Sequence, residues 1–247
     1  MVRLFDIQAS ALFTAYSPTH LFVLALFACS ILCLYTFRNS LREKRAGNIV
    51  RFSLVTVLVL SELSLNVWYI WHGQYDVKDT LPLELCTISL YLSVAMLIWK
   101  SRRLFQIVYF VGIGGALQAL LTPALDYDYP HFRFIEFFAA HIAIILAVLY
   151  MLWVEGYRPT LKSVFAAMGF LNLLLVAVGT VNAMTGGNYM FLARKPETAS
   201  LLDVLGPYPW YLLSLEVVAC LVFLLMYLPF AISARVRQVQ PQETGYD

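Results

Sequence analysis

Seven long apolar runs follow one another along the chain, and short polar stretches separate them. Most reach the roughly 20 residues that a helix needs to cross about 30 Å of hydrocarbon, and none shows the short alternating pattern of a barrel strand. The sequence therefore predicts an all-α polytopic membrane protein, a seven-helix bundle. The expected spans are 19–37, 50–72, 82–99, 104–123, 133–153, 162–185 and 209–232.

The basic residues are segregated between the two sides of this predicted bundle. One set of loops holds twelve of them, and the other set holds five. The positive-inside rule places the richer set in the cytoplasm, so we expect the N-terminus outside and the C-terminus inside a plasma membrane. The twelve are Arg38, Arg42, Lys44, Arg45, Arg51, Lys100, Arg102, Arg103, Arg158, Lys162, Arg235 and Arg237; the five are Arg3, Lys78, Arg133, Arg194 and Lys195.

Three parts are expected along the chain. An interfacial N-terminal segment covers 1–18, a seven-helix transmembrane domain covers 19–233, and a polar cytoplasmic tail covers 234–247. In the first part Arg3 and Asp6 stand among apolar residues, a pattern that predicts a short helix lying on the membrane surface.

Composition excludes several classes of function. With 61% hydrophobic and 13% charged residues and a mean hydropathy of +0.74, the chain is unlike a soluble domain. It has no nucleic-acid motif, and no Walker loop or dinucleotide fingerprint, so we expect no cofactor. All four cysteines lie in apolar runs, and no His-x-x-x-His or Cys-x-x-Cys pair is present, so neither a disulfide nor a metal site is expected.

Polar residues collect in the outer halves of six predicted spans. By helical rise, Cys86 lies about one turn and His141 about two turns below the outer surface. Ionisable groups at such depth are costly unless they face a protein-lined cavity. The sequence thus predicts a chamber open to the outer leaflet, and its other lining residues are Glu62, Asn66, Gln118, Asn182 and Glu216.

Structural roles compete with this interpretation. A single membrane histidine often bonds two helices together, and a single cysteine is often a small apolar filler. Such roles give no reason for polar groups to favour one leaflet.

Further expectations concern the outer ends and the packing of the spans. Arg133 and Glu136 pair with each other or with headgroups, and Arg133 or His131 meets a phosphate or carboxylate at the mouth. His20, His72 and His131 contact water at the interfaces, and Gly112, Gly114, Gly115, Gly169 and Gly179 allow close helix approach.

A thiol and an imidazole at this depth suggest nucleophilic catalysis. A cysteine becomes an effective nucleophile when a histidine within about 3 Å takes its proton. Cys86 and His141 can meet if the third and fifth spans are neighbours. Thr87 is the competing nucleophile, although it points about 100° away around the helix. An amide side chain is expected to stabilise the oxyanion, with Asn66, Gln118 and Asn182 as candidates.

Several strings of residues resemble one family. They are Leu81-Pro-Leu-Glu-Leu-Cys86, Gly114-Gly-Ala-Leu-Gln-Ala-Leu-Leu-Thr-Pro123, Tyr129-Pro-His-Phe-Arg-Phe134 running on to His141, Asn188-Tyr-Met, and Leu201-Leu-Asp-Val-Leu-Gly-Pro-Tyr-Pro-Trp210. The chain resembles the YwaF-like bacterial integral membrane proteins, which are similar to the transmembrane protein 164 acyltransferases and more remotely to the androgen-induced-gene lipid hydrolases.

The resemblance implies a cysteine nucleophile on the third span and a histidine on the fifth, which fall on Cys86 and His141. In the remoter hydrolases a threonine is the nucleophile, which keeps Thr87 as the second choice. Glu84 stands where the bacterial pattern often has histidine, and Ala124 where it often has aspartate, so the headgroup preference is left open.

The expected function is a lipid acyltransferase or lipid ester hydrolase acting on an outer-leaflet lipid. The first alternative is a non-catalytic lipid- or solute-binding membrane protein, a carrier or sensor. The second is a proton-coupled channel through Glu62, Glu216 and His141, which the apolar inner halves of the spans disfavour. The membrane lipid is the expected partner, nucleic acid is not, and the sequence leaves the lipid's identity and the oligomeric state open.

Overall fold

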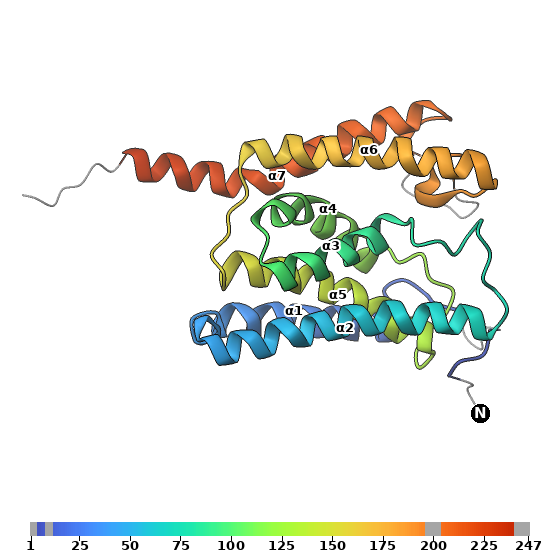
Figure 1. Cartoon of the computed structure of the whole chain (residues 1–247), viewed down its shortest axis with the longest axis horizontal. Helices are drawn as coiled ribbons and strands as arrows, with labels where there is room; N and C mark the ends of the chain where they lie inside the picture. Colours follow the sequence, from blue (N-terminus) through green and yellow to red (C-terminus); the bar gives the residue numbers. More distant parts are fainter. Residues whose placement is uncertain (1–3, 8–11, 196–203, 240–247) are drawn as a thin grey trace, which may run out of the picture.

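The computed structural model describes residues 4–7, 12–195 and 204–239, with side chains as far as residue 233. Its fold is all-α, as predicted. The helices are α1 Pro18–Phe37, α2 Lys44–Trp71, α3 Leu85–Trp99, α4 Arg102–Leu121, α5 Phe132–Trp153, α6 Leu161–Thr185 and α7 Trp210–Val239, with the short 3₁₀ turns η1 Ser40–Arg42 and η2 Tyr189–Phe191 (Figure 1).

Six of these helices are long and apolar enough to cross a membrane, which confirms a polytopic membrane protein. The exception is α3, which has only 15 residues. It begins at Leu85 rather than at residue 82 because Glu84 is in an extended conformation at the N-cap. The outer part of this predicted span is therefore a loop.

Polar residues fix several helix starts that hydropathy alone does not locate. Ser17 caps α1 and Ser101 caps α4, each accepting a backbone N–H with its hydroxyl. Thr160 and Ser163 form a reciprocal capping box at the start of α6. In α2 the helix begins at Lys44, six residues before the predicted span, because its basic first turns continue the helix beyond the apolar stretch.

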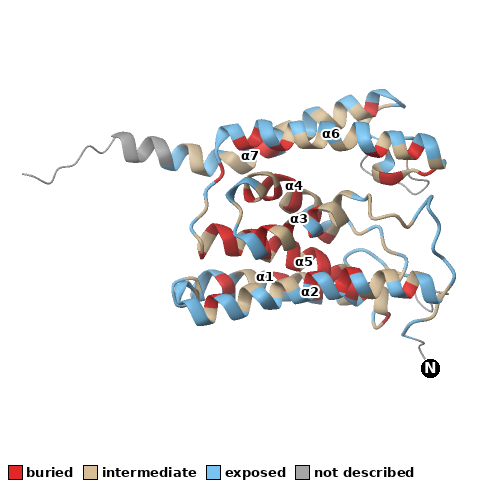
Figure 2. Ribbon diagram, in the orientation of Figure 1, coloured by how far each residue is buried: buried red, intermediate tan, exposed pale blue. Residues whose placement is uncertain are grey.

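The helix α5 lies at the centre of the bundle. Its most apolar stretch is 67% buried, compared with 6% for that of α7. It packs against α1, α2, α3 and α4, while α4 also contacts α6 and α7. In Figure 1 the pair α1 and α2 and the pair α6 and α7 lie on opposite sides of α3, α4 and α5, and Figure 2 shows buried residues concentrated on α4 and α5.

The glycines divide into two groups. A Cβ atom at Gly112 would lie 3.3 Å from Ile144 on α5, and one at Gly115 would lie 3.8 Å from Cys86 on α3, so α4 does approach its neighbours closely. The same expectation is wrong for Gly169 and Gly179, which have no described neighbouring atom within 4 Å of such a Cβ. Neither position is therefore a point of close approach between α6 and another described helix.

The N-terminal segment differs from the predicted surface helix. Residues 4–7 and 12–17 form turns and irregular structure, and 8–11 lie outside the described residues. The backbone carbonyls of residues 4–7 accept hydrogen bonds from groups elsewhere in the chain. In a helix they would accept from N–H groups four residues further along. Of the expected tail, residues 234–239 continue α7, and 240–247 lie outside the described part.

Residues 4–7 lie near one end of the bundle, and α7 runs out of the opposite end (Figure 1). This arrangement agrees with an odd number of crossings. Which end faces the cytoplasm stays a prediction from the charge distribution, and "outer" below means the end at which α3 and α5 begin.

Candidate functional site

Cys86 lies in the first turn of α3. The first helical N–H donor is that of Ile88, which donates to the Glu84 carbonyl at 3.0 Å. The amides of Leu85, Cys86 and Thr87 precede it and have no hydrogen-bond acceptor among the described residues. Free amides and the positive end of the helix dipole favour negative charge, so this turn offers donors for an oxyanion.

The Cys86 thiol is half-buried and faces α4. Gly115 presents only backbone to it, with its would-be Cβ 3.8 Å from the Sγ atom. Gln118 is three residues further along α4 and so lies on the same helix face. Its side chain is exposed. Of the three amides predicted for the oxyanion, Gln118 is therefore the one on the wall that meets Cys86.

His141 is held in one orientation by its own helix. The ring is 7% exposed, and its Nδ1 lies 2.6 Å from the Phe137 carbonyl. A carbonyl accepts only, so Nδ1 carries the proton and Nε2 keeps a lone pair. This is the tautomer that a general base requires.

The helices that carry Cys86 and His141 are neighbours, but no hydrogen bond connects the two side chains. Helices α3 and α5 pack against each other, as the sequence argument required. No hydrogen bond links the Sγ of Cys86 to the ring of His141 in the described part of the chain. Thr87, the alternative nucleophile, is also half-buried, and its hydroxyl has no partner there either.

Two serines on the Cys86 face of α3 are buried without a partner in the described part of the chain. Ser89 is 2% exposed and Ser93 is 0% exposed, and neither hydroxyl makes a hydrogen bond to a described residue. In contrast, Ser30 and Thr180 donate to the carbonyl four residues before them, as helical hydroxyls commonly do. The helical spacing of 86, 89 and 93 puts these residues on one face, but no sequence pattern indicates that the two hydroxyls are unpaired.

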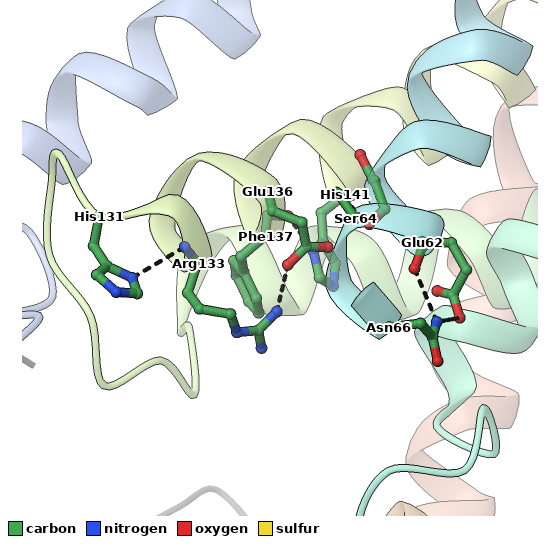
Figure 3. A network of polar contacts seen from close by, with 9 residues as sticks. Glu62, Ser64, Asn66, His131, Arg133, Glu136, Phe137 and His141 are labelled. Carbon is green, nitrogen blue, oxygen red and sulfur yellow. Dashed lines mark hydrogen bonds and ion pairs between the residues drawn. The ribbon is translucent and has the colours of Figure 1, made fainter. Parts of the chain in front are cut away.

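A cluster of hydrogen-bonded polar groups joins α2 to α3. The Oε1 atom of Glu62 accepts from Asn66 Nδ2 at 2.9 Å and from the Tyr91 hydroxyl at 2.7 Å. Asn66 also donates to the Glu62 carbonyl at 2.8 Å. Sequence analysis proposed Glu62 and Asn66 as lining residues but missed Tyr91, whose i+5 position relative to Cys86 gives no such signal. Figure 3 shows the Glu62–Asn66 contact.

Arg133 and Glu136 form an ion pair in the outer part of α5, as predicted (Figure 3). The Arg133 guanidinium also lies 5.7 Å from the centre of the Tyr69 ring on α2. Glu136 is close enough to Glu62 for the two carboxylates to repel each other. Two acidic groups and one basic group therefore lie near one another, Glu62 on α2 and the Arg133–Glu136 pair on α5.

The expectation that His20 and His131 contact water is wrong, because they are 0% and 2% exposed. The Nε2 of His20 donates to the Leu120 carbonyl at 2.8 Å, and its Nδ1 accepts the Tyr16 N–H. His131 likewise uses both nitrogens, donating to the Asp6 carbonyl and accepting the Arg133 N–H.

The remaining predicted residues bond to other parts of the outer half. Asn182 donates to the Tyr189 carbonyl at 3.0 Å and accepts the Tyr189 N–H at 2.9 Å. Glu84 accepts the Met190 N–H at 3.3 Å, and Glu216 accepts from Asn172 at 3.0 Å. These contacts tie α6 to η2, α3 to η2 and α6 to α7. The predicted lining residues thus fall into several separate groups rather than one hydrogen-bonded cluster.

No three His, Cys, Asp or Glu side chains come together as possible metal ligands within the residues that the structure describes. The candidate chemistry is therefore that of Cys86, His141 and the polar groups around them.

Comparison with known proteins places the chain in a family. The model of the TMEM164 family matches residues 15–227. An uncharacterized protein of Treponema pallidum (strain Nichols) is 27% identical over 155 residues, a stretch that covers 62% of this chain and 63% of that protein. The match thus spans less than two thirds of the relative's length, and no solved structure matches the chain. Because the family model covers most of its length, including every predicted site residue, the chain belongs to the TMEM164 family.

Proposed function

We propose that this protein transfers or hydrolyses an acyl chain of a membrane lipid, with Cys86 as the nucleophile and His141 as the general base. The observation that carries the proposal is the Cys86 thiol in the first turn of α3, beside three amides without acceptors among the described residues. The His141 tautomer, with its lone pair on Nε2, supports it. The chain belongs to the TMEM164 family, and the resemblance to the transmembrane protein 164 acyltransferases supports an acyl-lipid substrate.

The reaction has two halves. His141 Nε2 takes the thiol proton, and the Cys86 sulfur attacks the ester carbonyl of the lipid to form a tetrahedral oxyanion. The C–O bond then breaks, the lyso-lipid alkoxide takes the proton from His141, and a thioester remains on Cys86. Water or the hydroxyl of a second lipid attacks this thioester, which completes hydrolysis or transfer respectively.

Two groups are placed to stabilise the oxyanion. The free amides of the first turn of α3 lie beside the sulfur, and Gln118 stands on the facing wall of α4. Asn66 and Asn182 are already bonded to Glu62 and Tyr189, so the oxyanion role passes to Gln118 and the backbone. Arg133, at the outer part of α5, is the group for a lipid phosphate, and Thr87 is the second choice of nucleophile.

The proton must cross the gap between Cys86 and His141. Catalytic hydrogen bonds are often long in the absence of substrate and tighten when it binds. Ser89 and Ser93 lie on the same face of α3 as Cys86, and their hydroxyls are unpaired among the described residues. The proton therefore has two routes: a direct Cys86–His141 hydrogen bond that forms when substrate binds, or a water held by these hydroxyls.

Intact-protein mass spectrometry after incubation with a short-chain phospholipid tests the proposal. The wild-type protein should gain the mass of one acyl group, and Cys86→Ala should gain none. Cys220→Ala, which removes another half-buried thiol, is the matched control and should behave as wild type. His141→Ala should slow the gain by roughly a hundredfold or more, since general base catalysis contributes factors of this size.

A gain on Cys86→Ala would move the nucleophile to Thr87 or another hydroxyl. The absence of a gain on every variant, with no lipid turnover across several headgroups, would contradict the enzyme.

Binding of a lipid without turnover is the alternative function. The observation that favours it is the lack of a hydrogen bond between Cys86 and His141, both of which the structure describes. Under this alternative His141→Ala changes the affinity for the lipid, whereas an enzyme loses turnover and still binds. Equilibrium binding of a labelled phospholipid to both proteins separates the two.

A further inference from the structure

Residues 4–7, called the strap here, are bound to the outer ends of α2 and α5 through their backbone carbonyls. Four separate groups donate to four consecutive carbonyls. The bonds are Phe132 N–H to Leu4 O at 2.8 Å, Trp68 Nε1 to Phe5 O at 3.0 Å, His131 Nε2 to Asp6 O at 2.8 Å, and Tyr127 hydroxyl to Ile7 O at 2.9 Å.

The aromatic groups that hold the strap also pack against one another. Tyr127 stacks on His131 with ring centres 4.2 Å apart and planes 13° from parallel. Trp68 meets both of these rings edge-on, and Phe5 of the strap lies 5.5 Å from Phe132. The donors therefore form a rigid row that binds the backbone of the strap, whichever side chains that backbone carries.

His131 joins the strap to the start of α5. Its Nδ1 accepts the Arg133 N–H at 3.1 Å and so caps the helix, while its Nε2 donates to the strap at Asp6. Only the neutral ring with its proton on Nε2 makes both bonds. A second proton on Nδ1 would point at the Arg133 N–H, so the helix cap and the present ring position would be lost together.

We propose that the strap is a releasable cover on the outer ends of α2 and α5, and that protonation of His131 releases it. Release leaves the Trp68, Tyr127 and Phe132 donors without their strap acceptors, next to Arg133. The inference concerns a regulatory contact and does not depend on the proposed acyl chemistry.

The electrostatic surroundings of His131 agree with this proposal. Burial lowers the pKa of His131 below its usual 6.5, and Arg133 on α5 and His72 after α2 lower it as well. Asp6 of the strap acts in the opposite direction, through its carbonyl and its carboxylate. Burial outweighs the effect of Asp6, so the pKa of His131 lies below 6.5 while the ring occupies this position, and protonation favours a state in which the ring leaves it. Strap binding is complete above about pH 6.5 and weakens as the pH falls below that value.

Hydrogen–deuterium exchange on the full-length protein in detergent micelles tests the strap. The reporters are the Phe132 and Arg133 amides, which donate to Leu4 and His131 respectively. After correction for the intrinsic effect of pH, both amides should exchange about tenfold faster at pH 5.5 than at pH 7.5. One pH unit below 6.5 gives a factor of about eleven for a group that is protonated only after release.

Three variants separate the strap from general loosening of the fold. The asparagine introduced by His131→Asn retains a cap acceptor and an N–H donor but does not titrate, so the exchange of this variant should be equal at both pH values. His72→Asn, which replaces the neighbouring histidine, should still exchange faster at pH 5.5 than at pH 7.5, because His131 still titrates. Trp68→Phe removes one strap donor and should raise the exchange of Phe132 at pH 7.5. Unchanged wild-type protection at both pH values, or a wild-type pH response in His131→Asn, would overturn the proposal.

Discussion

The Tyr91 hydroxyl on α3 donates a 2.7 Å hydrogen bond to the Oε1 atom of Glu62 on α2. The same oxygen accepts from Asn66, so one carboxylate oxygen connects two helices. Tyr91 is 44% exposed, whereas Glu62 is 9% exposed. The tyrosine thus reaches inward from the edge of the bundle and stabilises a carboxylate that lies in an apolar surrounding. The short helix α3, and with it Cys86, is fixed to α2 at this point.

Tyr91→Phe should destabilise the protein by about 1–3 kcal/mol, because the buried Glu62 carboxylate loses one of its hydrogen bonds. The thermal unfolding midpoint in detergent measures the change. Tyr35→Phe is the matched control, since the Tyr35 hydroxyl makes no hydrogen bond among the described residues while its ring is similarly exposed, at 47%. Equal midpoints for the two variants would show that the Tyr91–Glu62 bond adds no stability.

The helices were predictable from the sequence because transfer into hydrocarbon is a sum over residues, and long apolar runs reveal that sum directly. The prediction was wrong where backbone conformation or backbone hydrogen bonds set the start or the form of a segment. Hydropathy extended the third span to residue 82, but the extended conformation of Glu84 at the N-cap delays the start of α3 to Leu85. The apolar pattern also predicted a surface helix for the N-terminal segment, whereas long-range bonds from Trp68 and Tyr127 hold residues 4–7 in another form.

The candidate site was predictable only in part, because depth along a helix says nothing about the partner of a polar group. Glu62 and Asn66 are paired as their spacing indicated, and Arg133 pairs with Glu136. Asn182 bonds instead to the backbone of Tyr189, seven residues away. Such pairings depend on how loops fold back, which periodicity does not encode.

Ser93→Ala should leave the free energy of unfolding unchanged or raise it slightly. The Ser93 hydroxyl is buried without a partner among the described residues. An unpaired buried polar group costs about 1–3 kcal/mol of stability, and its removal relieves this cost. If a bound water already pairs with the hydroxyl, there is little cost to relieve and the stability stays unchanged. Ser163 is equally buried but belongs to a capping box, so Ser163→Ala should lose about 1 kcal/mol.

Chemical denaturation of both serine variants gives the comparison. If Ser93 also lies on the proton path, Ser93→Ala will slow acyl labelling of Cys86 without any loss of stability. A destabilisation of Ser93→Ala as large as that of Ser163→Ala would mean that the hydroxyl has a structural partner after all.

Asn182→Ala should open the turn that follows α6. The Asn182 side chain is 4% exposed and satisfies both the N–H and the carbonyl of the buried Tyr189. Its loss leaves two buried backbone groups unpaired, at about 1–3 kcal/mol each. Asn182→Asp preserves the acceptor and loses the donor, so its cost should be intermediate. Limited trypsin digestion at Arg194 measures the opening, and cleavage of Asn182→Ala no faster than that of wild type would contradict this role.

Gly187→Ala should separate the turn after α6 from the loop that precedes α3. A Cβ atom at Gly187 would lie 2.7 Å from the Lys78 carbonyl oxygen and 3.2 Å from the Tyr189 ring, and a backbone oxygen cannot move as a flexible side chain does. The expected loss is about 1–3 kcal/mol, the usual cost of overpacking.

Gly179→Ala on the preceding helix is the matched control, because no described atom lies within 4 Å of its Cβ. That substitution should stabilise α6 by up to about 1 kcal/mol, since alanine is the better helix former. Thermal unfolding of the two variants should therefore shift in opposite directions, and a Gly187→Ala protein as stable as wild type would mean that the two loops are not in contact.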